Sequence, residues 1–101
     1  MSEHDELVGN PGLEEATKVL GLMSHGDRLR VLCHLSSEGE LTVGQLLERI
    51  DLSGSALSQH LAKLRKHGLV ETRKEHQKVY YRVNREDIGE ILNTLHGLYC
   101  R

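Results

Sequence analysis

The sequence predicts a mainly α-helical domain with one small β-hairpin. Apolar residues recur at intervals of three and four along most of the chain, the spacing that places them on one face of a helix. The exception is residues 69–83, where β-branched and aromatic residues alternate with polar ones, as in a half-buried strand. With 101 residues, three Tyr and no Phe or Trp, the chain has the length of one domain, and its core must consist mainly of Leu, Val, Ile and Ala.

The N-terminal part of the sequence predicts a tail and then two helices. Residues 1–11 are polar and acidic and end in the helix breakers of "GNP", so we expect them to be disordered and residues 12–101 to form the domain. The segment "SSEGE" is expected to be the turn that follows the second helix. The expected apolar positions are Leu13, Ala16, Leu20 and Met23 in the first helix, and Leu29, Leu32, Cys33 and Ser36 on one side of the second.

Two further helices are expected to be joined by a tight turn. Thr42 is suited to cap a short helix over "VGQLLERI", because its hydroxyl can accept a free backbone N–H of the first turn. The segment "DLSG" then makes a short connection, and Ser53 or Ser55 can cap the next helix. That helix is expected to end at Gly68, because glycine readily adopts the left-handed conformation that closes many helices.

A hairpin and a final helix complete the predicted order. In "LVETRKEHQKVYYRV", Val79, Tyr81 and Val83 alternate with polar neighbours, and the tip of the hairpin is expected near "KEHQK". Asn84 is expected to cap the last helix, whose acidic first turn suits the positive end of a helix dipole. The apolar face of this helix consists of Ile88, Ile91, Leu92, Leu95, Leu98 and Tyr99.

Charge is distributed unevenly along the chain, although its formal net charge is only −2. Residues 53–85 contain eight Lys and Arg against two Asp and Glu, whereas residues 1–52 contain four against ten. A basic block inside an otherwise acidic domain is typical of a surface that binds a polyanion. On charge alone, an ordinary solvated surface is the alternative interpretation.

The expected helix over residues 53–68 has one apolar side and one polar side. At about 100° per residue, Leu57, Leu61 and Leu64 fall together, and a small, polar and basic face lies opposite. A short helix, a tight turn and a second helix of this kind form the helix-turn-helix pattern, whose second helix enters the major groove of DNA. The hairpin that follows makes the pattern a winged helix-turn-helix. An ordinary amphipathic core helix is the alternative.

The types of the outward-facing residues suggest roles at a DNA surface. Gln59 can pair with adenine edges, and Ser55 and Ser58 with several base edges or with phosphate. Basic and polar side chains of the helix and the hairpin, including His76, suit phosphate oxygens. We therefore expect double-stranded DNA to be contacted by Ser55, Ser58, Gln59, His60, Lys63, Lys66, Arg73, Lys74, Gln77 and Lys78.

Three segments of the chain together resemble the ArsR/SmtB family of small bacterial repressors. They are "MSHGDRLRVLCHL", the stretch from "LTVGQLLERI" through "SGSALSQHLAKLRKHGLV" to "YYRV", and "LHGLYC", and they cover nearly all of the chain after Leu13. The resemblance implies a homodimer, joined through its first and last helices, that binds palindromic operator DNA and releases it when an inducer binds. His60 resembles the histidine of the family's recognition helix.

The metal-ligand patterns of the family are broken in this sequence. The segment "LTVGQLLERI", where the resemblance implies a thiolate site, contains no Cys or His. In the last helix the family's Asp-x-His and His-x-x-Glu patterns become Asp87-x-Gly89 and His96-x-x-Tyr99. We therefore expect no metal site and no cofactor. A repressor that responds to a metal or metalloid stays an alternative.

The two cysteines carry a second part of the resemblance. Cys33 in "RVLCHL" and Cys100 in "LYC" resemble the pair found in the reactive-sulfur branch of the family, of the SqrR, BigR and HlyU type. The resemblance implies that persulfides link the two thiols through a sulfur bridge and that DNA is then released. From the residues alone, Cys33 is expected on the apolar side of its helix. A small buried Cys33 and an incidental thiol at Cys100 are the alternative.

The sequence argues against several other classes of function. The chain has no CxxC motif and no acid–base partner for a nucleophile, so we do not expect an enzyme. It has no apolar run of about 18 residues and begins with an acidic segment unlike a signal peptide, so we expect a cytoplasmic protein that does not span a membrane. Three alternatives stay open: a winged helix that binds only protein, a general thiol-oxidation regulator, and a HlyU-type anti-repressor.

Overall fold

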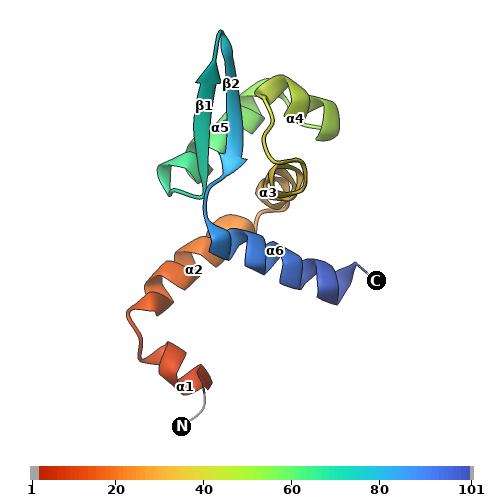
Figure 1. The fold of residues 1–101 in the computed structure, drawn as a ribbon. Helices are drawn as coiled ribbons and strands as arrows, with labels where there is room; N and C mark the ends of the chain where they lie inside the picture. The colour runs from red at the N-terminus through yellow and green to blue at the C-terminus, as the bar shows by residue number, and fades with distance from the viewer. Residues whose placement is uncertain (1–2, 101) are drawn as a thin grey trace.

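The computed structural model describes residues 3–100, which form six helices and a two-stranded antiparallel hairpin (Figure 1). The predicted class, mainly helical with one small hairpin in a winged helix-turn-helix order, is confirmed. The elements are α1 (Glu3–Val8), α2 (Gly12–Met23), α3 (Gly26–Glu38), α4 (Val43–Arg49), α5 (Gly54–Lys66), β1 (Val70–Glu75), β2 (Lys78–Val83) and α6 (Glu86–Tyr99).

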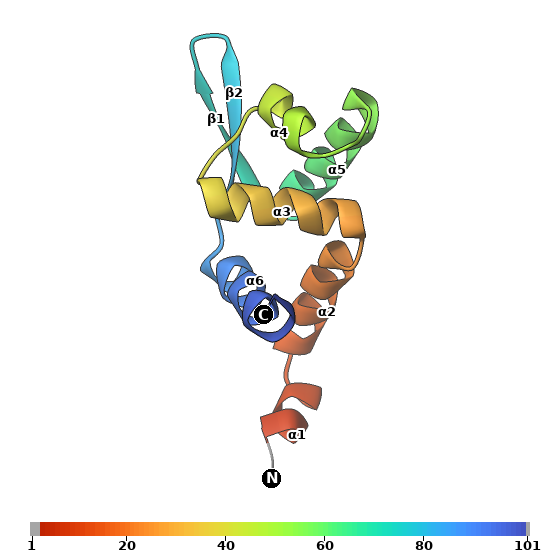
Figure 2. The same ribbon diagram turned by 90° about the vertical axis from the view of Figure 1, so that its right-hand side faces the viewer.

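Helix α3 lies between two groups of elements. Figure 2 shows the hairpin, α4 and α5 on one side of α3, and α2 and α6 on the other. A single apolar core connects the two groups, and no polar or charged side chain is buried among residues 5–100. The core consists of Val19, Leu22, Met23, Val31, Leu32, Leu35, Leu41, Leu46, Ile50, Leu57, Leu61, Leu64, Leu69, Val70, Ile88 and Leu92.

The expectation of a disordered tail over residues 1–11 differs from the structure, because the described part of this stretch contains α1. The N–H of Asn10 donates to the carbonyl of Leu7 at 3.1 Å, which closes the turn after α1. The Asn10 side-chain oxygen then accepts the N–H of Gly12 at 2.8 Å, where α2 begins. The helix breakers of "GNP" therefore separate two helices. The limits of the predicted domain, residues 12–101, stay a prediction.

The buried faces of α2 and α3 differ from those expected. In α2, Val19 and Leu22 face the core with Met23, whereas Leu20 of the expected stripe is 56% exposed. The buried face is therefore displaced around the helix axis from the expected stripe, with Met23 common to both. In α3, the expectation that Cys33 lies on the apolar side is wrong, because Cys33 is exposed.

Capping residues set where both helices of the helix-turn-helix begin and where the second one ends, at the positions that the sequence predicts. Thr42 accepts the N–H of Gln45 at 3.1 Å, and the Gln45 side chain accepts the N–H of Thr42 at 2.9 Å, forming a capping box at the start of α4. Ser53 accepts the N–H of Ala56 at 3.1 Å and so is the cap of α5. At the other end, Gly68 has a φ of 78° and closes the helix in a Schellman motif.

The hairpin pairs β1 and β2 through a two-residue turn at His76 and Gln77, within the predicted tip. The loop between α3 and α4 adds to this sheet, because the backbones of Leu41 and Tyr81 exchange two hydrogen bonds of 3.1 and 2.8 Å. The base of the wing is therefore attached to the end of α3. This attachment positions the wing relative to α5.

The last helix begins one residue later than an Asn84 cap requires. Arg85 occupies the cap position of α6 and makes no capping hydrogen bond with its side chain, so the expected Asn84 cap is wrong. The Arg85 guanidinium instead pairs with Asp87 and, through a 3.0 Å contact, with Glu15 of α2. Within residues 3–100, no helix combines the length and the apolar character needed to cross a membrane.

Candidate nucleic-acid interface and thiol pair

Helix α5 has a buried apolar side and an exposed polar side. Leu57, Leu61 and Leu64 are each at most 1% exposed, so three core anchors fix the rotation of the helix about its axis. The expected DNA-reading residues Ser55, Ser58 and Gln59 are all exposed on the other side, as are Lys63 and Lys66. The small side chains near the N-terminus of α5 leave its backbone accessible, which suits entry into a major groove.

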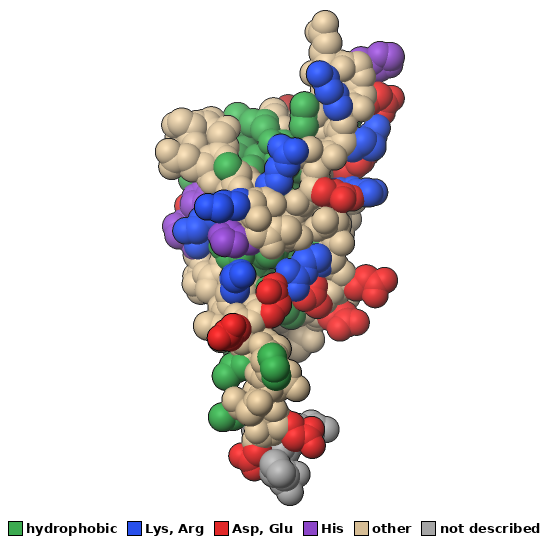
Figure 3. Space-filling model, turned by 90° about the vertical axis from the view of Figure 1, so that its left-hand side faces the viewer, with side chains coloured by type: hydrophobic (Ala, Val, Ile, Leu, Met, Phe, Trp, Pro, Cys, Tyr) green, Lys and Arg blue, Asp and Glu red, His purple; other side chains and the backbone are tan. Residues whose placement is uncertain are grey.

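The lysines of this surface are free of intramolecular ion pairs. Among residues 6–100, the ion pairs use an arginine or histidine as the cation, whereas Lys63, Lys66, Lys74 and Lys78 are exposed and unpaired. Figure 3 shows Lys, Arg and His side chains over the wing and α5, with most of the acidic side chains lower on the same face. A run of free ammonium groups on α5 and the wing can bind the phosphates of a duplex.

Arg73 lies on the wing as expected, but its charge is already engaged. Its guanidinium contacts Glu40 at 2.5 Å, contacts Glu75 at 2.6 Å and lies over the ring of Tyr80, 4.7 Å from the centroid. The hydrogen bonds that Arg73 donates to Glu40 and Glu75 raise the pKa of Arg73 above its usual value. This arrangement favours a role for Arg73 in holding the wing, whereas Lys74, Gln77 and Lys78 are exposed near its tip.

His60 of α5 lies in a small cluster that the sequence did not reveal. Its ring centroid is 4.7 Å from that of His25, and Asp27 completes a group whose ligand atoms all lie within 4.8 Å of one another. Partial burial and the neighbouring His25 and Arg28 lower the pKa of His60, with Asp27 acting in the opposite direction. His60 is therefore mostly neutral at pH 7 and adds little positive charge to the surface.

The two cysteines lie near each other at the groove between α3 and α6. Cys33 lines this groove together with Leu92, Asn93 and His96 of α6. Cys100 follows one turn later, and its N–H donates to the carbonyl of His96 at 2.9 Å. Both thiols are free and exposed. Partial desolvation by the groove raises the pKa of Cys33, and Cys100 raises it further because two thiolates repel each other.

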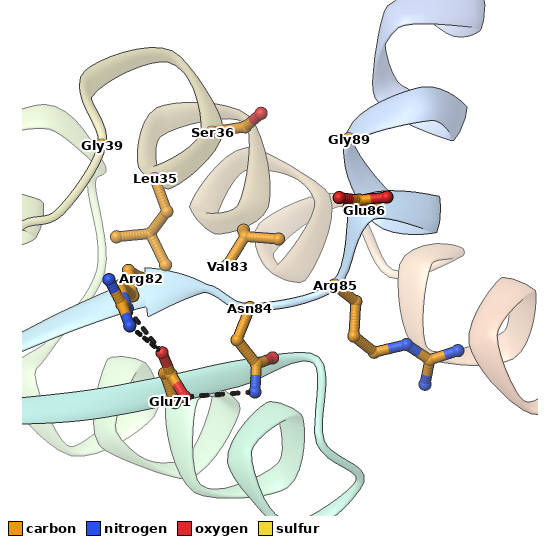
Figure 4. Close-up of a pocket in the computed structure, with 10 residues that line it drawn as sticks. All are labelled: Leu35, Ser36, Gly39, Glu71, Arg82, Val83, Asn84, Arg85, Glu86 and Gly89. Atoms are coloured by element: carbon orange, nitrogen blue, oxygen red, sulfur yellow. Dashed lines mark hydrogen bonds and ion pairs between the residues drawn. The ribbon is translucent and has the colours of Figure 1, made fainter.

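A cavity of about 520 Å³ lies at the base of the wing (Figure 4). Arg82 and Arg85 are among the residues that line it, but both are paired with carboxylates, Arg82 with Glu71 and Arg85 with Asp87 and Glu15. Neither arginine offers a free charge to a ligand. The cavity lies between α3, the wing and the start of α6, and its two arginines are engaged with carboxylates of the cavity itself or of residues nearby.

Comparison with known proteins places this fold in a family. The family model described as "Bacterial regulatory protein, arsR family" matches residues 25–72, from the start of α3 into β1. The transcriptional activator HlyU of Vibrio cholerae is 47% identical over 87 residues, which are 86% of this chain and 80% of that protein. This chain belongs to the ArsR family.

Solved structures extend the similarity of this ArsR-family protein to the whole fold. The structure of reduced HlyU from Vibrio cholerae has a TM-score of 0.85 and 43% identity, and covers 94% of this chain and 99% of that one. The structure of the transcriptional repressor BigR from Xylella fastidiosa has a TM-score of 0.86 and 33% identity, and covers 100% of this chain and 99% of that one. This ArsR-family chain is a transcriptional regulator with a winged helix-turn-helix fold.

Proposed function

We propose that this ArsR-family regulator is a homodimeric repressor whose affinity for palindromic operator DNA is controlled by Cys33 and Cys100. In the reduced state, α5 and the wing bind DNA. When the two thiols react with persulfides, a sulfur bridge joins α3 to α6 and DNA is released. The observation that carries the proposal is the proximity of the two free thiols at the α3–α6 groove, where burial and the neighbouring Cys100 raise the pKa of Cys33.

The DNA-binding part of the proposal rests on how the polar side of α5 is presented. Ser55, Ser58 and Gln59 are accessible for base edges, and the unpaired Lys63 and Lys66 lie further along the helix for phosphate. His60 lies beside them and is partly buried. Lys74, Gln77 and Lys78 extend the same binding to the wing. Arg73 acts indirectly, by fixing the direction of the wing.

The homodimer is supported by apolar side chains that one chain leaves uncovered. Leu20 of α2 is 56% exposed, and Leu98 and Tyr99 of α6 are 52% and 78% exposed. These helices are the first long helix and the last, and both lie on the side of α3 away from the DNA-reading elements (Figure 2). Burying these side chains against a second copy removes apolar area from water, and it sets the spacing of two α5 helices on a palindrome.

The proposed sulfur chemistry needs no oxidant besides the persulfide. The Cys33 thiolate attacks the outer, sulfane sulfur of a persulfide RSSH, forms Cys33-SSH and expels the thiol RSH; a second RSSH converts Cys100 in the same way. The Cys33 persulfide anion then attacks the inner sulfur of the Cys100 persulfide and expels HS⁻. A three-sulfur bridge results. The two sulfane sulfurs supply the oxidising equivalents, and one of them leaves in reduced form.

A sulfur bridge between Cys33 and Cys100 can change the position of the DNA-reading helices through α3. Leu32 and Leu35 of α3 share the core with Leu57 and Leu61 of α5, while α6 carries the uncovered apolar residues of the dimer surface. A covalent link between α3 and α6 therefore changes how the DNA-reading half is held relative to the dimer. A coupling of about 1–3 kcal/mol between the two events is enough for induction.

An anti-repressor is the second candidate function, because HlyU of Vibrio cholerae, at 47% identity, is described as an activator. An anti-repressor raises transcription by displacing another repressor from a shared site. In vitro transcription from the operator with this protein and RNA polymerase alone separates the two. Repression without any other regulator supports the proposed function, and no effect supports the anti-repressor.

Mass spectrometry of the protein with both cysteines present tests the proposed chemistry. The reduced protein is treated with a persulfide and, separately, with hydrogen peroxide, and peptides containing Cys33 and Cys100 are identified. A direct disulfide requires Cα atoms within about 7 Å, and we propose that Cys33 and Cys100 lie somewhat farther apart than this. We therefore expect the persulfide to give a bridge with at least one added sulfur and peroxide to give little plain disulfide. Equal yields of a plain Cys33–Cys100 disulfide from both reagents would contradict the proposed selectivity.

A further inference from the structure

The imidazoles of His25 and His60 and the carboxylate of Asp27 meet at a point that the function proposed above does not use. His25 lies in the turn before α3 and caps that helix, Asp27 lies in its first turn, and His60 lies in the middle of α5. Their ligand atoms are all within 4.8 Å of one another, and the two rings are tilted by 53° with centroids 4.7 Å apart. Two elements separated by more than 30 residues of sequence thus bring three metal-binding groups together.

We propose that His25, Asp27 and His60 form a binding site for a divalent transition-metal ion, with Zn²⁺ as the best fit. Two imidazole nitrogens and one carboxylate oxygen are a donor set that Zn²⁺ accepts, with a fourth position left for water. Tetrahedral bonds of about 2.0–2.1 Å require ligand atoms closer together than 4.8 Å, the limit within which all three lie here. His25 is exposed, so its side chain can rotate to close the site.

The surroundings predict a weak site that competes with a helix cap. The Nδ1 atom of His25 accepts the N–H of Asp27 at 3.2 Å, and a ligand nitrogen on the same neutral ring is incompatible with that bond. Arg30 already contacts Oδ1 of Asp27 at 2.8 Å, and Arg28 and Lys63 add positive charge near His60. Metal binding therefore releases the cap of α3 and ties the start of α3 to α5.

The site is distinct from the sequence patterns that the family resemblance implies. Those patterns lie in residues 41–50 and in α6, and here they lack their ligands. Cys33 and Cys100 lie on the other part of α3 and at the end of α6, and neither belongs to the cluster. The failure of this inference would leave the proposed thiol function unaffected, and the reverse also holds.

Metal titration in a thiol-free background tests the site. Zn²⁺ and Co²⁺ are titrated into the full chain carrying Cys33→Ser and Cys100→Ser, so that thiolates cannot bind the ion. We expect one ion per chain, visible ligand-field absorption with Co²⁺, and displacement of Co²⁺ by Zn²⁺. His60→Gln and His25→Ser should each weaken binding by at least about tenfold, whereas His76→Gln at the wing tip should leave it unchanged. Serine is itself a good helix cap, so His25→Ser removes the ligand and keeps α3 capped.

A spectroscopic readout keeps the inference testable if a variant folds poorly. Imidazole resonances of the same thiol-free protein are followed by NMR during the Zn²⁺ titration. Shifts confined to His25 and His60 support the site. The inference is overturned by an absence of binding, by resonances that move at other histidines instead, or by equal affinity in folded His60→Gln.

Discussion

The guanidinium of Arg73 and the carboxylate of Glu40 form a bidentate pair across 33 residues of sequence, with N–O distances of 3.2 and 2.5 Å. Glu40 is next to Leu41, whose backbone pairs with Tyr81 of β2. The wing is thus connected to the end of α3 by an ion pair as well as by backbone hydrogen bonds. Arg73 is better suited to setting the direction of the wing than to binding phosphate.

The first prediction separates these two roles of Arg73 by the salt dependence of DNA binding. Arg73→Ala should weaken DNA binding but leave the slope of log affinity against log salt unchanged, because Arg73 neutralises no phosphate. Its neighbour Lys74 is the matched control, and Lys74→Ala should reduce that slope by about 1. Fluorescence anisotropy at several salt concentrations measures both. A loss of slope in Arg73→Ala equal to that in Lys74→Ala would show that Arg73 contacts phosphate.

A second prediction concerns two residues on the accessible side of α5. Gln59→Ala should lose about 1–3 kcal/mol of preference for the operator over a scrambled duplex, because it removes a contact to a base edge. Lys63→Ala should weaken binding to both duplexes by the same factor. Parallel anisotropy titrations with the two duplexes compare the variants. If Gln59→Ala still discriminates between the operator and the scrambled duplex as well as the wild type does, Gln59 does not contact a base edge.

The uncovered apolar residues give a third prediction. Leu20→Asp and Leu98→Asp should each shift the protein from dimer to monomer, because a buried unpaired carboxylate is costly at an apolar interface. Val79→Asp is the control, since Val79 is also exposed, at 38%, but lies on the wing. Sedimentation analysis reports the oligomeric state. Dimers that survive both substitutions at micromolar concentration would show that the copies meet elsewhere.

The reactivity of Cys33 is the subject of a fourth prediction. Burial and the neighbouring Cys100 both raise the pKa of Cys33, so its thiolate is scarce at neutral pH and becomes abundant only as the pH rises past that pKa. The rate of Cys33 alkylation should therefore reach its midpoint at a higher pH than in an unfolded peptide. Cys100→Ser should move this midpoint to lower pH. A midpoint that does not change in Cys100→Ser would mean that the two thiols are not coupled.

Local patterns accounted for most of the fold. The cap residues Thr42 and Ser53 and the left-handed Gly68 each act within a few residues of sequence, so their roles could be predicted from the sequence. The buried side of α5 followed from the spacing of three leucines for the same reason. The first helix was missed because α1 has only six residues and contributes no side chain to the core.

What the sequence could not predict depends on contacts between distant segments. The Glu40–Arg73 pair and the His25–His60 contact join residues more than 30 positions apart, and nothing in the spacing of either pair indicates that they meet. The sequence predicted Cys33 on the apolar side of α3. In the structure Val31, Leu32 and Leu35 face the core, and Cys33 lies at the surface beside them. A helical stripe alone could not distinguish the edge of the buried face from its centre.

Operator release by single-cysteine variants tests the central claim most directly. Wild type, Cys33→Ser and Cys100→Ser are bound to labelled operator DNA in the reduced state, and a persulfide is added while anisotropy is recorded. We predict that all three proteins bind the operator with similar affinity and that only the wild type releases it, with rebinding after reduction. Release of DNA by either single variant, at the rate seen for the wild type, would contradict the dithiol switch.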